Sequence, residues 1–170
     1  ALHGGDTVCA DEIGEAQKEQ LDAVVALIDA VYNERGQIDA ASGAKIDKAW
    51  AAYGELPEEL RSVVSNLARL NTADEVWMVV DAIENIGTVT LDSKEDITVL
   101  RAEYKALGPE KRPLVGNYGK LNTAIATLYG LEKEAAIKAM QNGGKDDGKN
   151  DGPDKAPTTG VAAAGAAALP

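Results

Sequence analysis

The sequence predicts an all-α protein: two tandem three-helix bundles that share a continuous connecting helix, followed by a disordered tail. Three observations predict this. Hydrophobic residues make up 45% of the chain but aromatic residues only 4%, with no Phe, so Ala, Leu, Val and Ile must fill the core, which suits helices. Apolar residues recur at helical spacing, and a segment of the chain repeats at an offset of 51 residues.

The repeat relates residues 42–73 to residues 93–124 without a gap. Thirteen of the 32 aligned positions are identical. Such periodicity indicates that one structural unit is used twice. The identical pairs are Ser42/Ser93, Ile46/Ile97, Ala51/Ala102, Tyr53/Tyr104, Leu56/Leu107, Glu59/Glu110, Arg61/Arg112, Val64/Val115, Asn66/Asn117, Leu70/Leu121, Asn71/Asn122, Thr72/Thr123 and Ala73/Ala124.

The first two helices of each unit follow from apolar spacing and end signals. Ser42 and Ser93 stand where a helix N-cap belongs, and Asp96 follows Ser93 three residues later, close to a capping box. The following residues carry apolar positions three and four apart. The three predicted helical faces are Leu21, Val24, Val25, Ile28, Val31 and Tyr32; Ile46, Ala49, Trp50, Tyr53 and Leu56; and Ile97, Leu100, Tyr104 and Leu107.

A short extra turn is expected near 58–64 and again near 109–115. Pro57 opens the first of these, and Gly108-Pro109 closes one helix and opens the next. Asn66 and Asn117 are expected to cap the third helix of each unit. Helical spacing then runs across the unit boundary, so we expect one shared helix, with a bend near Asn71-Thr72; its apolar residues are Leu67, Leu70, Val76, Trp77, Val80 and Ile83.

These signals divide the chain into four parts. Residues 1–12 form a flexible N-terminal segment, 13–73 helical repeat 1, 74–141 helical repeat 2, and 142–170 a disordered linker with a tail that resembles a sorting signal. One unit of this size buries only a marginal core. Stacking the two through a shared helix adds interface.

Charge and composition exclude several classes of partner. The formal net charge is −11, which argues against nucleic acid and against an anionic membrane face, because both need a Lys/Arg surface. No stretch reaches about 18 consecutive apolar residues, the length a membrane span needs. The chain begins at Ala1 without an apolar leader, so we expect either a removed signal peptide or an excised fragment.

No catalytic, cofactor-binding or metal-binding residue is predicted, and the chain is not expected to be an enzyme. The single histidine, His3, lies in a Gly-rich terminal stretch and cannot join a positioned triad. The single cysteine, Cys9, permits no intrachain disulfide; it is read as uninvolved, with an intermolecular link or lipidation as alternatives. The Asp residues at 146–154 fit neither the spacing nor the context of a calcium loop, which needs a Gly at its sixth position, a Glu at its twelfth and flanking helices.

The aromatic residues raise one alternative, because exposed aromatics in a line would indicate sugar binding. Most of them fall on the predicted apolar helix faces, so core packing is expected. Tyr129 is the aromatic most expected to be exposed. Adjacent acids such as Glu58-Glu59 are read as helix-start residues and not as a glycosidase pair.

The second copy, VVDAIENIGTVTLDSKEDITVLRAEYKALGPEKRPLVGNYGKL (79–121), resembles a helical repeat of large secreted and wall-attached proteins of Gram-positive bacteria. The first copy departs from that pattern by a net insertion of about four residues before Ser42 and by Leu67 in place of a Tyr. The resemblance implies an extracellular structural module without catalytic residues. Its matching elements are Val80, Ile83, Ile86-Gly87, Val89-Thr90-Leu91-Asp92-Ser93, Ile97, Arg101, Tyr104, Leu107, Val115, Asn117-Tyr118 and Leu121.

The C-terminal tail resembles a wall-sorting signal. Residues 141–160 contain no Leu, Ile, Val or aromatic residue, and such a composition cannot offset the entropy of ordering. The following motif, Ala156-Pro157-Thr158-Thr159-Gly160, resembles the LPxTG signal with Ala in place of Leu. In that family a sortase cuts between Thr and Gly and joins the new carboxyl to peptidoglycan. The apolar residues after Gly160 are too few to span a bilayer, and no Lys or Arg follows them.

These observations predict a non-catalytic structural or spacer module of a bacterial cell-surface protein, anchored to the wall through its C-terminal region. It is expected to be extracellular, monomeric and without a cofactor, with a sortase and cell-wall peptidoglycan as partners. Two alternatives stay open. One is an adhesin-type module that recognises a host glycan or protein, and the other is an accessory region of an extracellular enzyme.

Overall fold

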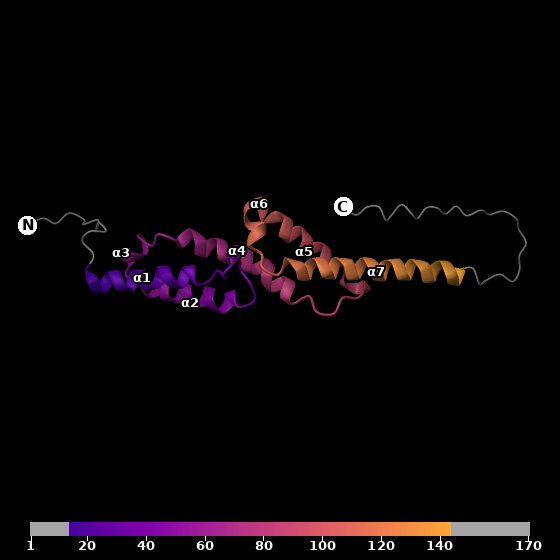
Figure 1. Cartoon of the computed structure of the whole chain (residues 1–170), viewed down its shortest axis with the longest axis horizontal. Coiled ribbons are helices and arrows are strands. Elements are labelled where there is room, and N and C mark those ends of the chain that lie inside the picture. The colour runs from indigo at the N-terminus through magenta and orange to yellow at the C-terminus, as the bar shows by residue number, and fades with distance from the viewer. Residues whose placement is uncertain (1–13, 144–170) are drawn as a thin grey trace, which may run out of the picture. The chain divides into compact units, whose positions relative to one another are not determined.

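The computed structural model describes residues 14–143, which are helical throughout apart from short connections (Figure 1). No strand occurs in this range, and extended pairing is limited to one isolated bridge between Ile38 and Val115. The elements are α1 (Glu15–Asp29), α2 (Ser42–Glu55), α3 (Glu58–Arg61), α4 (Leu67–Glu84), η2 (Leu91–Ser93), α5 (Lys94–Ala106), α6 (Gly108–Lys111), η3 (Arg112–Leu114) and α7 (Tyr118–Gly143). The all-α prediction is confirmed for these residues.

Helix α4 packs on helices from both repeats. It contacts α1 and α2, which also contact each other, and it contacts α5. A helix with partners on more than one side needs apolar residues on more than one face, and α4 buries residues along its whole length. The helix is continuous through Asn71-Thr72, and the bend expected there stays a prediction. Its buried residues are Leu70, Ala73, Val76, Val79, Val80 and Ile83.

The core is aliphatic, as the composition predicts. Ile28, Ile38 and Leu70 are completely buried, and aromatic residues pack only around the edge of the core. The compact body of the structure ends at Gly130, and Leu131–Gly143 of α7 forms a separate unit. The buried residues of α7, Leu121, Ala124 and Leu128, all precede that point. Every residue from Lys133 to Gly143 is exposed.

The two serines that were expected to cap helices have another role. Ser42 is the first residue of α2 and is 1% exposed; its hydroxyl accepts a hydrogen bond from Asp39 N–H at 3.0 Å and donates one to the Val31 carbonyl at 2.8 Å. Ser93 likewise accepts from Thr90 N–H at 3.0 Å. The serines therefore tie back the preceding loop, and the expected cap on the following helix is absent.

The helix-start residues in these loops are Asp39 and Thr90, three residues before the serines. The Asp39 carboxylate accepts from Ala41 N–H at 2.9 Å, and the Thr90 hydroxyl accepts from Asp92 N–H at 3.2 Å. The side chain of each residue thus accepts from the backbone N–H two positions on, in the turn that leads into the helix. This side-chain bond before a helix, which we call the helix-start device, occurs in both repeats.

The predicted short turns are confirmed. They are α3, which follows α2, and α6 with η3, which follow α5. Gly108 has φ +82°, a conformation that favours glycine. Pro57 lies one position before its helix, which begins at Glu58.

Candidate functional site

Within 14–143, no group of three or more His, Cys, Asp or Glu side chains could hold a metal ion. None of the helices in this range is long and apolar enough to cross a bilayer. His3, Cys9 and the motif Ala156–Gly160 lie outside the described residues. The described residues do form a direct contact between the two repeats.

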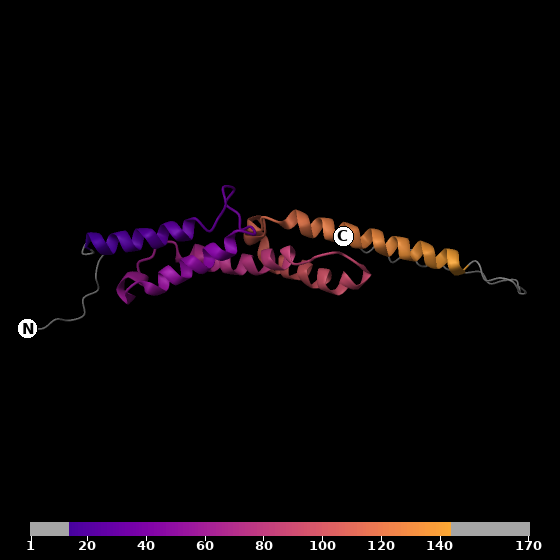
Figure 2. The same ribbon diagram turned by 90° about the horizontal axis from the view of Figure 1, so that it is seen from below.

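This contact joins the loop between α1 and α2 to the turn before α7. Ile38 N–H donates to the Leu114 carbonyl at 2.7 Å, and Gly116 N–H donates to the Ile38 carbonyl at 2.8 Å. The Gln37 side chain adds a bond to the Pro113 carbonyl at 3.1 Å. Figure 2 shows the purple loop beside the start of the orange helix α7. We call this set of contacts the inter-repeat bridge.

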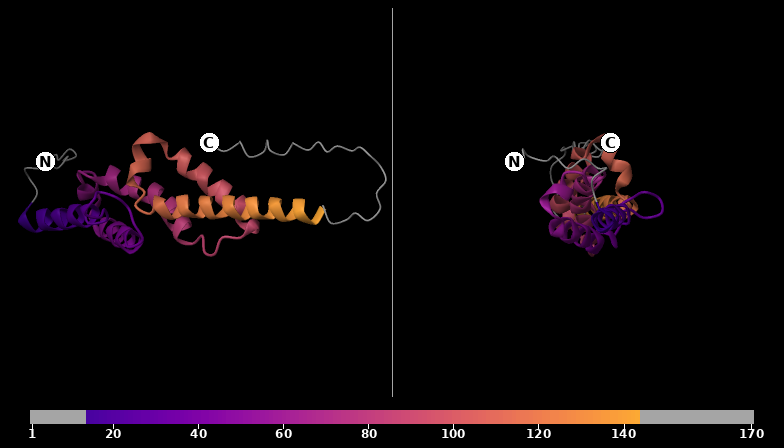
Figure 3. Two further views of the ribbon diagram at one scale, coloured as in Figure 1. Left: turned by 45° about the vertical axis from the view of Figure 1, so that its right-hand side comes forward. Right: turned by 90° about the vertical axis from the view of Figure 1, so that its left-hand side faces the viewer.

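The loop is held in shape by its own side chains before it reaches the bridge. The Asn33 carbonyl oxygen accepts from Arg35 N–H at 2.9 Å and from Gln37 N–H at 3.0 Å, while its amide donates to Asp39 at 3.0 Å. Gly36 supplies the positive φ of +74° that the tight turn needs. The loop tip is exposed and stands out in the right-hand view of Figure 3.

Each repeat also contains the same asparagine clamp. The Asn66 amide donates to the Val25 carbonyl and to the Asp29 carboxylate, both at 3.0 Å. The Asn117 amide donates to the Val80 carbonyl at 2.9 Å and to Glu84 at 3.0 Å. Asn66 does occupy the N-cap position of α4, but its side chain makes no cap bond. The clamp therefore joins the third helix of each repeat to the first, in place of the predicted cap.

A basic residue next to each clamp contacts the same carboxylate. Arg69 lies 3.5 Å from Asp29, and Lys120 lies 2.6 Å from Glu84. Arg69 also lies over the Tyr32 ring at 4.4 Å, and the Tyr32 hydroxyl donates to the Arg69 carbonyl at 2.8 Å. These pairs are largely exposed, so each contributes little alone.

The arginine that is identical in the two repeats makes one contact in both. Arg61 donates to the Gly54 carbonyl at 2.7 Å, and Arg112 donates to the Lys105 carbonyl at 2.8 Å. Gly54 and Lys105 are 51 residues apart, like the two arginines. The side chain thereby satisfies a carbonyl near the end of the preceding helix.

The aromatic residues pack mostly as predicted. Tyr104 and Tyr118 stack at 4.3 Å, and Trp50 meets Tyr53 edge to face at 5.7 Å. Trp50 also donates to Asp74 at 2.7 Å. Tyr129 is 49% exposed, in agreement with the sequence-based expectation. The partly buried aromatic residues that pack against the core are Tyr32, Trp50, Tyr53, Trp77, Tyr104 and Tyr118.

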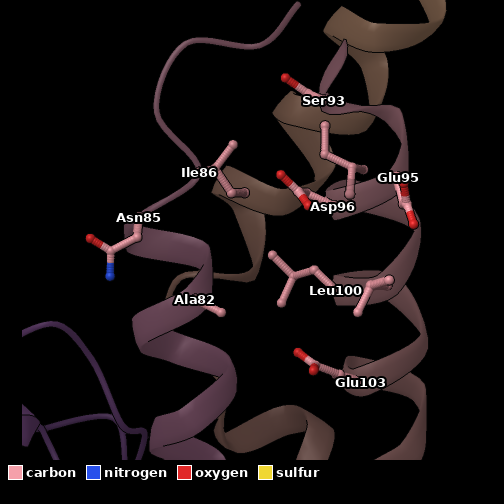
Figure 4. Close-up of a pocket in the computed structure, with 10 residues that line it drawn as sticks. Ala82, Asn85, Ile86, Ser93, Glu95, Asp96, Leu100 and Glu103 are labelled. Atoms are coloured by element: carbon pink, nitrogen blue, oxygen red, sulfur yellow. The ribbon is translucent and has the colours of Figure 1, made fainter. Parts of the chain in front are cut away.

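A pocket of about 350 Å³ lies between the C-terminal end of α4 and α5. Figure 4 shows the carboxylates of Asp96 and Glu103 pointing from α5 toward α4. Glu95 adds a third acid to the lining, beside apolar side chains such as Ile86 and Leu100. Repeat 1 has Ala, Lys and Ala at the positions that match the three acids. The acidic lining is therefore no part of the shared architecture of the repeats.

The pKa values of two carboxylates record the loop and clamp contacts. The hydrogen bond from Asn33 holds the pKa of Asp39 below its ordinary value. The bond from Lys120, followed by that from Asn117, lowers the pKa of Glu84. Both carboxylates are therefore ionised at neutral pH. They stabilise structure as acceptors and are not tuned for proton transfer.

Comparison with known proteins finds no match: no family model matches the chain, and neither the curated proteins nor the solved structures contain a significant relative. The inter-repeat bridge could not be predicted from the sequence, because backbone groups form it between segments about 76 positions apart. The clamp had a signal, since Asn66 and Asn117 are identical in the alignment.

Proposed function

We propose that the chain is a non-catalytic structural spacer of a cell-surface protein, built as two tandem three-helix bundles that share α4. One observation carries this: the asparagine clamp, the arginine contact and the helix-start device each occur twice, at matching positions. Packing contacts that recur at matching positions in the part of the chain that the structure describes favour a structural role. A shared helix favours mechanical continuity between units.

The spacer proposal is tested by backbone ¹⁵N relaxation of the whole chain. If α4 couples the repeats, amides in α2 and in α5 should report one common rotational correlation time. The exposed C-terminal part of α7 serves as a control, because its amides are expected to report a different correlation time. Different correlation times for α2 and α5 would show independently moving bundles, and the spacer proposal would fail.

Attachment to a cell wall is the second part of the proposal. It is supported by the resemblance of residues 79–121 and by Ala156–Gly160, which would be recognised by a sortase and joined to peptidoglycan. Reading the gene beyond both ends tests it. A secretory leader upstream, with about ten more apolar residues and a basic tail downstream, is expected from the length a span requires. A stop codon directly after Pro170 would sink the anchoring proposal.

An adhesin-type role is the second candidate, and one observation favours it. Leu91 and Val99 are 49% and 51% exposed, and Val99 lines the pocket between α4 and α5. A contact surface for a partner needs a contiguous exposed apolar patch, and these two side chains would form part of it. A screen of the purified chain against host glycans and matrix proteins tests this, with Val99→Ser as the matched variant. No hit, or hits that the variant leaves unchanged, would count against it.

A further inference from the structure

The two repeats differ most in the loop that forms the inter-repeat bridge. After Ser42 the repeats match at an offset of 51. In the preceding helix the clamp contacts match Val25 to Val80 and Asp29 to Glu84, an offset of 55. The difference, 55 minus 51, is an insertion of four residues in repeat 1. It falls in the segment that contains Asn33 and Gly36.

Repeat 1 has a docking edge at Ile38, and the matching residue of repeat 2 makes no such contact within the part of the chain that the structure describes. Ile38 is completely buried, and its N–H and its carbonyl both bond to the turn before α7. Val89 holds the matching position in repeat 2 and is only partly buried. Within residues 14–143, the backbone of Val89 forms no such hydrogen bond. Among the described residues, only the loop of repeat 1, which is ordered by Asn33, bonds through its backbone to the turn of another repeat.

The turn that receives this edge is also specific, because it contains Gly116. A Cβ on Gly116 would lie 2.7 Å from the Ile38 carbonyl oxygen and 3.4 Å from Asp39 Cβ. Real Cβ atoms essentially never approach an oxygen so closely. Gly116 is not among the glycines with positive φ, so close approach and not backbone freedom requires glycine here. The matching residue in the turn of repeat 1 is Ser65.

We infer that the edge at Gln37 and Ile38 is an interaction surface for the turn of the following repeat, and that Gly116 determines which turn can dock. A turn with serine at this position, as in repeat 1, has a Cβ atom where the Ile38 carbonyl oxygen leaves no room for one. Contact between repeats is therefore directional. The loop of repeat 1 binds the turn of the repeat that follows it. The turn of repeat 1, which has Ser65 in place of glycine, would not fit against such a loop. This inference rests on the two-repeat architecture proposed above and not on cell-wall attachment.

The test replaces Gly116 in the full chain by serine, which copies repeat 1, and by alanine. Gly119→Ser is the matched control, because a Cβ there meets nothing within 4 Å. The reverse change, Ser65→Gly, is a second control. Hydrogen exchange of the Ile38 N–H is read by NMR. In both Gly116 variants it should become at least about tenfold faster, because local opening no longer breaks two backbone bonds. Both controls should leave it unchanged.

An unchanged Ile38 exchange rate in both Gly116 variants would overturn the inference. The spacer proposal would survive that result, because the clamps and α4 do not depend on the bridge. Circular dichroism checks that helix content is kept. If Gly116→Ser loses helix, Gly116→Ala decides the matter, since its single methyl meets the same oxygen. Faster exchange in Gly119→Ser as well would also contradict a role specific to Gly116.

Discussion

The asparagine clamps allow a prediction in which the chain provides its own controls. We consider Asn117→Ala and Asn66→Ala. Each substitution removes two hydrogen bonds, one to a backbone carbonyl and one to a carboxylate. Each bond of the first kind contributes about 1 kcal/mol net, and a bond to a charged group about 1.5–3 kcal/mol when it is shielded from water.

Exposure decides how much of that energy is realised. The Glu84 side chain is 29% exposed, whereas that of Asp29 is 56% exposed, so solvent weakens the bond to Asp29 more. Both asparagines also leave a buried Oδ1 atom without a partner, and the alanine variants remove that unfavourable group. We therefore expect a loss of about 2 kcal/mol for Asn117→Ala and about 1 kcal/mol for Asn66→Ala.

Urea unfolding followed by circular dichroism measures these losses, and Asn71→Ala and Asn122→Ala are the controls. Both control residues are exposed, lie in the same two helices and are themselves 51 positions apart. They should change the free energy of unfolding by no more than about 0.7 kcal/mol, through helix propensity. The clamp interpretation is refuted if the clamp variants cost no more than these controls.

Three further predictions concern pH and packing. Glu84 has a lowered pKa in the folded chain, so its stabilisation is present above its ordinary value of 4.5 and is lost as the pH falls through the lowered value; Glu84→Gln should flatten the fall in urea midpoint between pH 5 and pH 3. Gly43→Ala should cost about 1–3 kcal/mol and alter tryptophan fluorescence, because the added Cβ would lie 2.4 Å from the Trp77 ring; Gly54→Ala, which meets nothing, should not. Leu70→Ala, at a completely buried position, should cost about 2–5 kcal/mol in urea unfolding, and a cost below 1 kcal/mol would contradict the packing described.

The sequence predicted the helices because their signals are local. Apolar spacing of three and four residues marks a buried face wherever a helix forms, and the positions of Ile46 and Ile97 illustrate this in both repeats. The alignment also singled out Asn66 and Asn117 before any contact was known. It could not assign their role, because an asparagine before a helix usually caps it. Only the packing of α1 beside α4 provides the Val25 carbonyl and the Asp29 carboxylate as nearer partners.

The fold class, the repeat and the aliphatic core follow from the order of residue types, since each of these depends on which residue types recur at which spacing. The contact between repeat 1 and repeat 2 is visible only in the folded chain. That contact is made by main-chain groups of Ile38 and Gly116, which every residue type carries, and by the absence of a side chain at Gly116. A hydrogen bond between backbone groups does not depend on residue type, so the sequence does not indicate it. The need for glycine at position 116 can be explained only once the position of the Ile38 carbonyl oxygen is known.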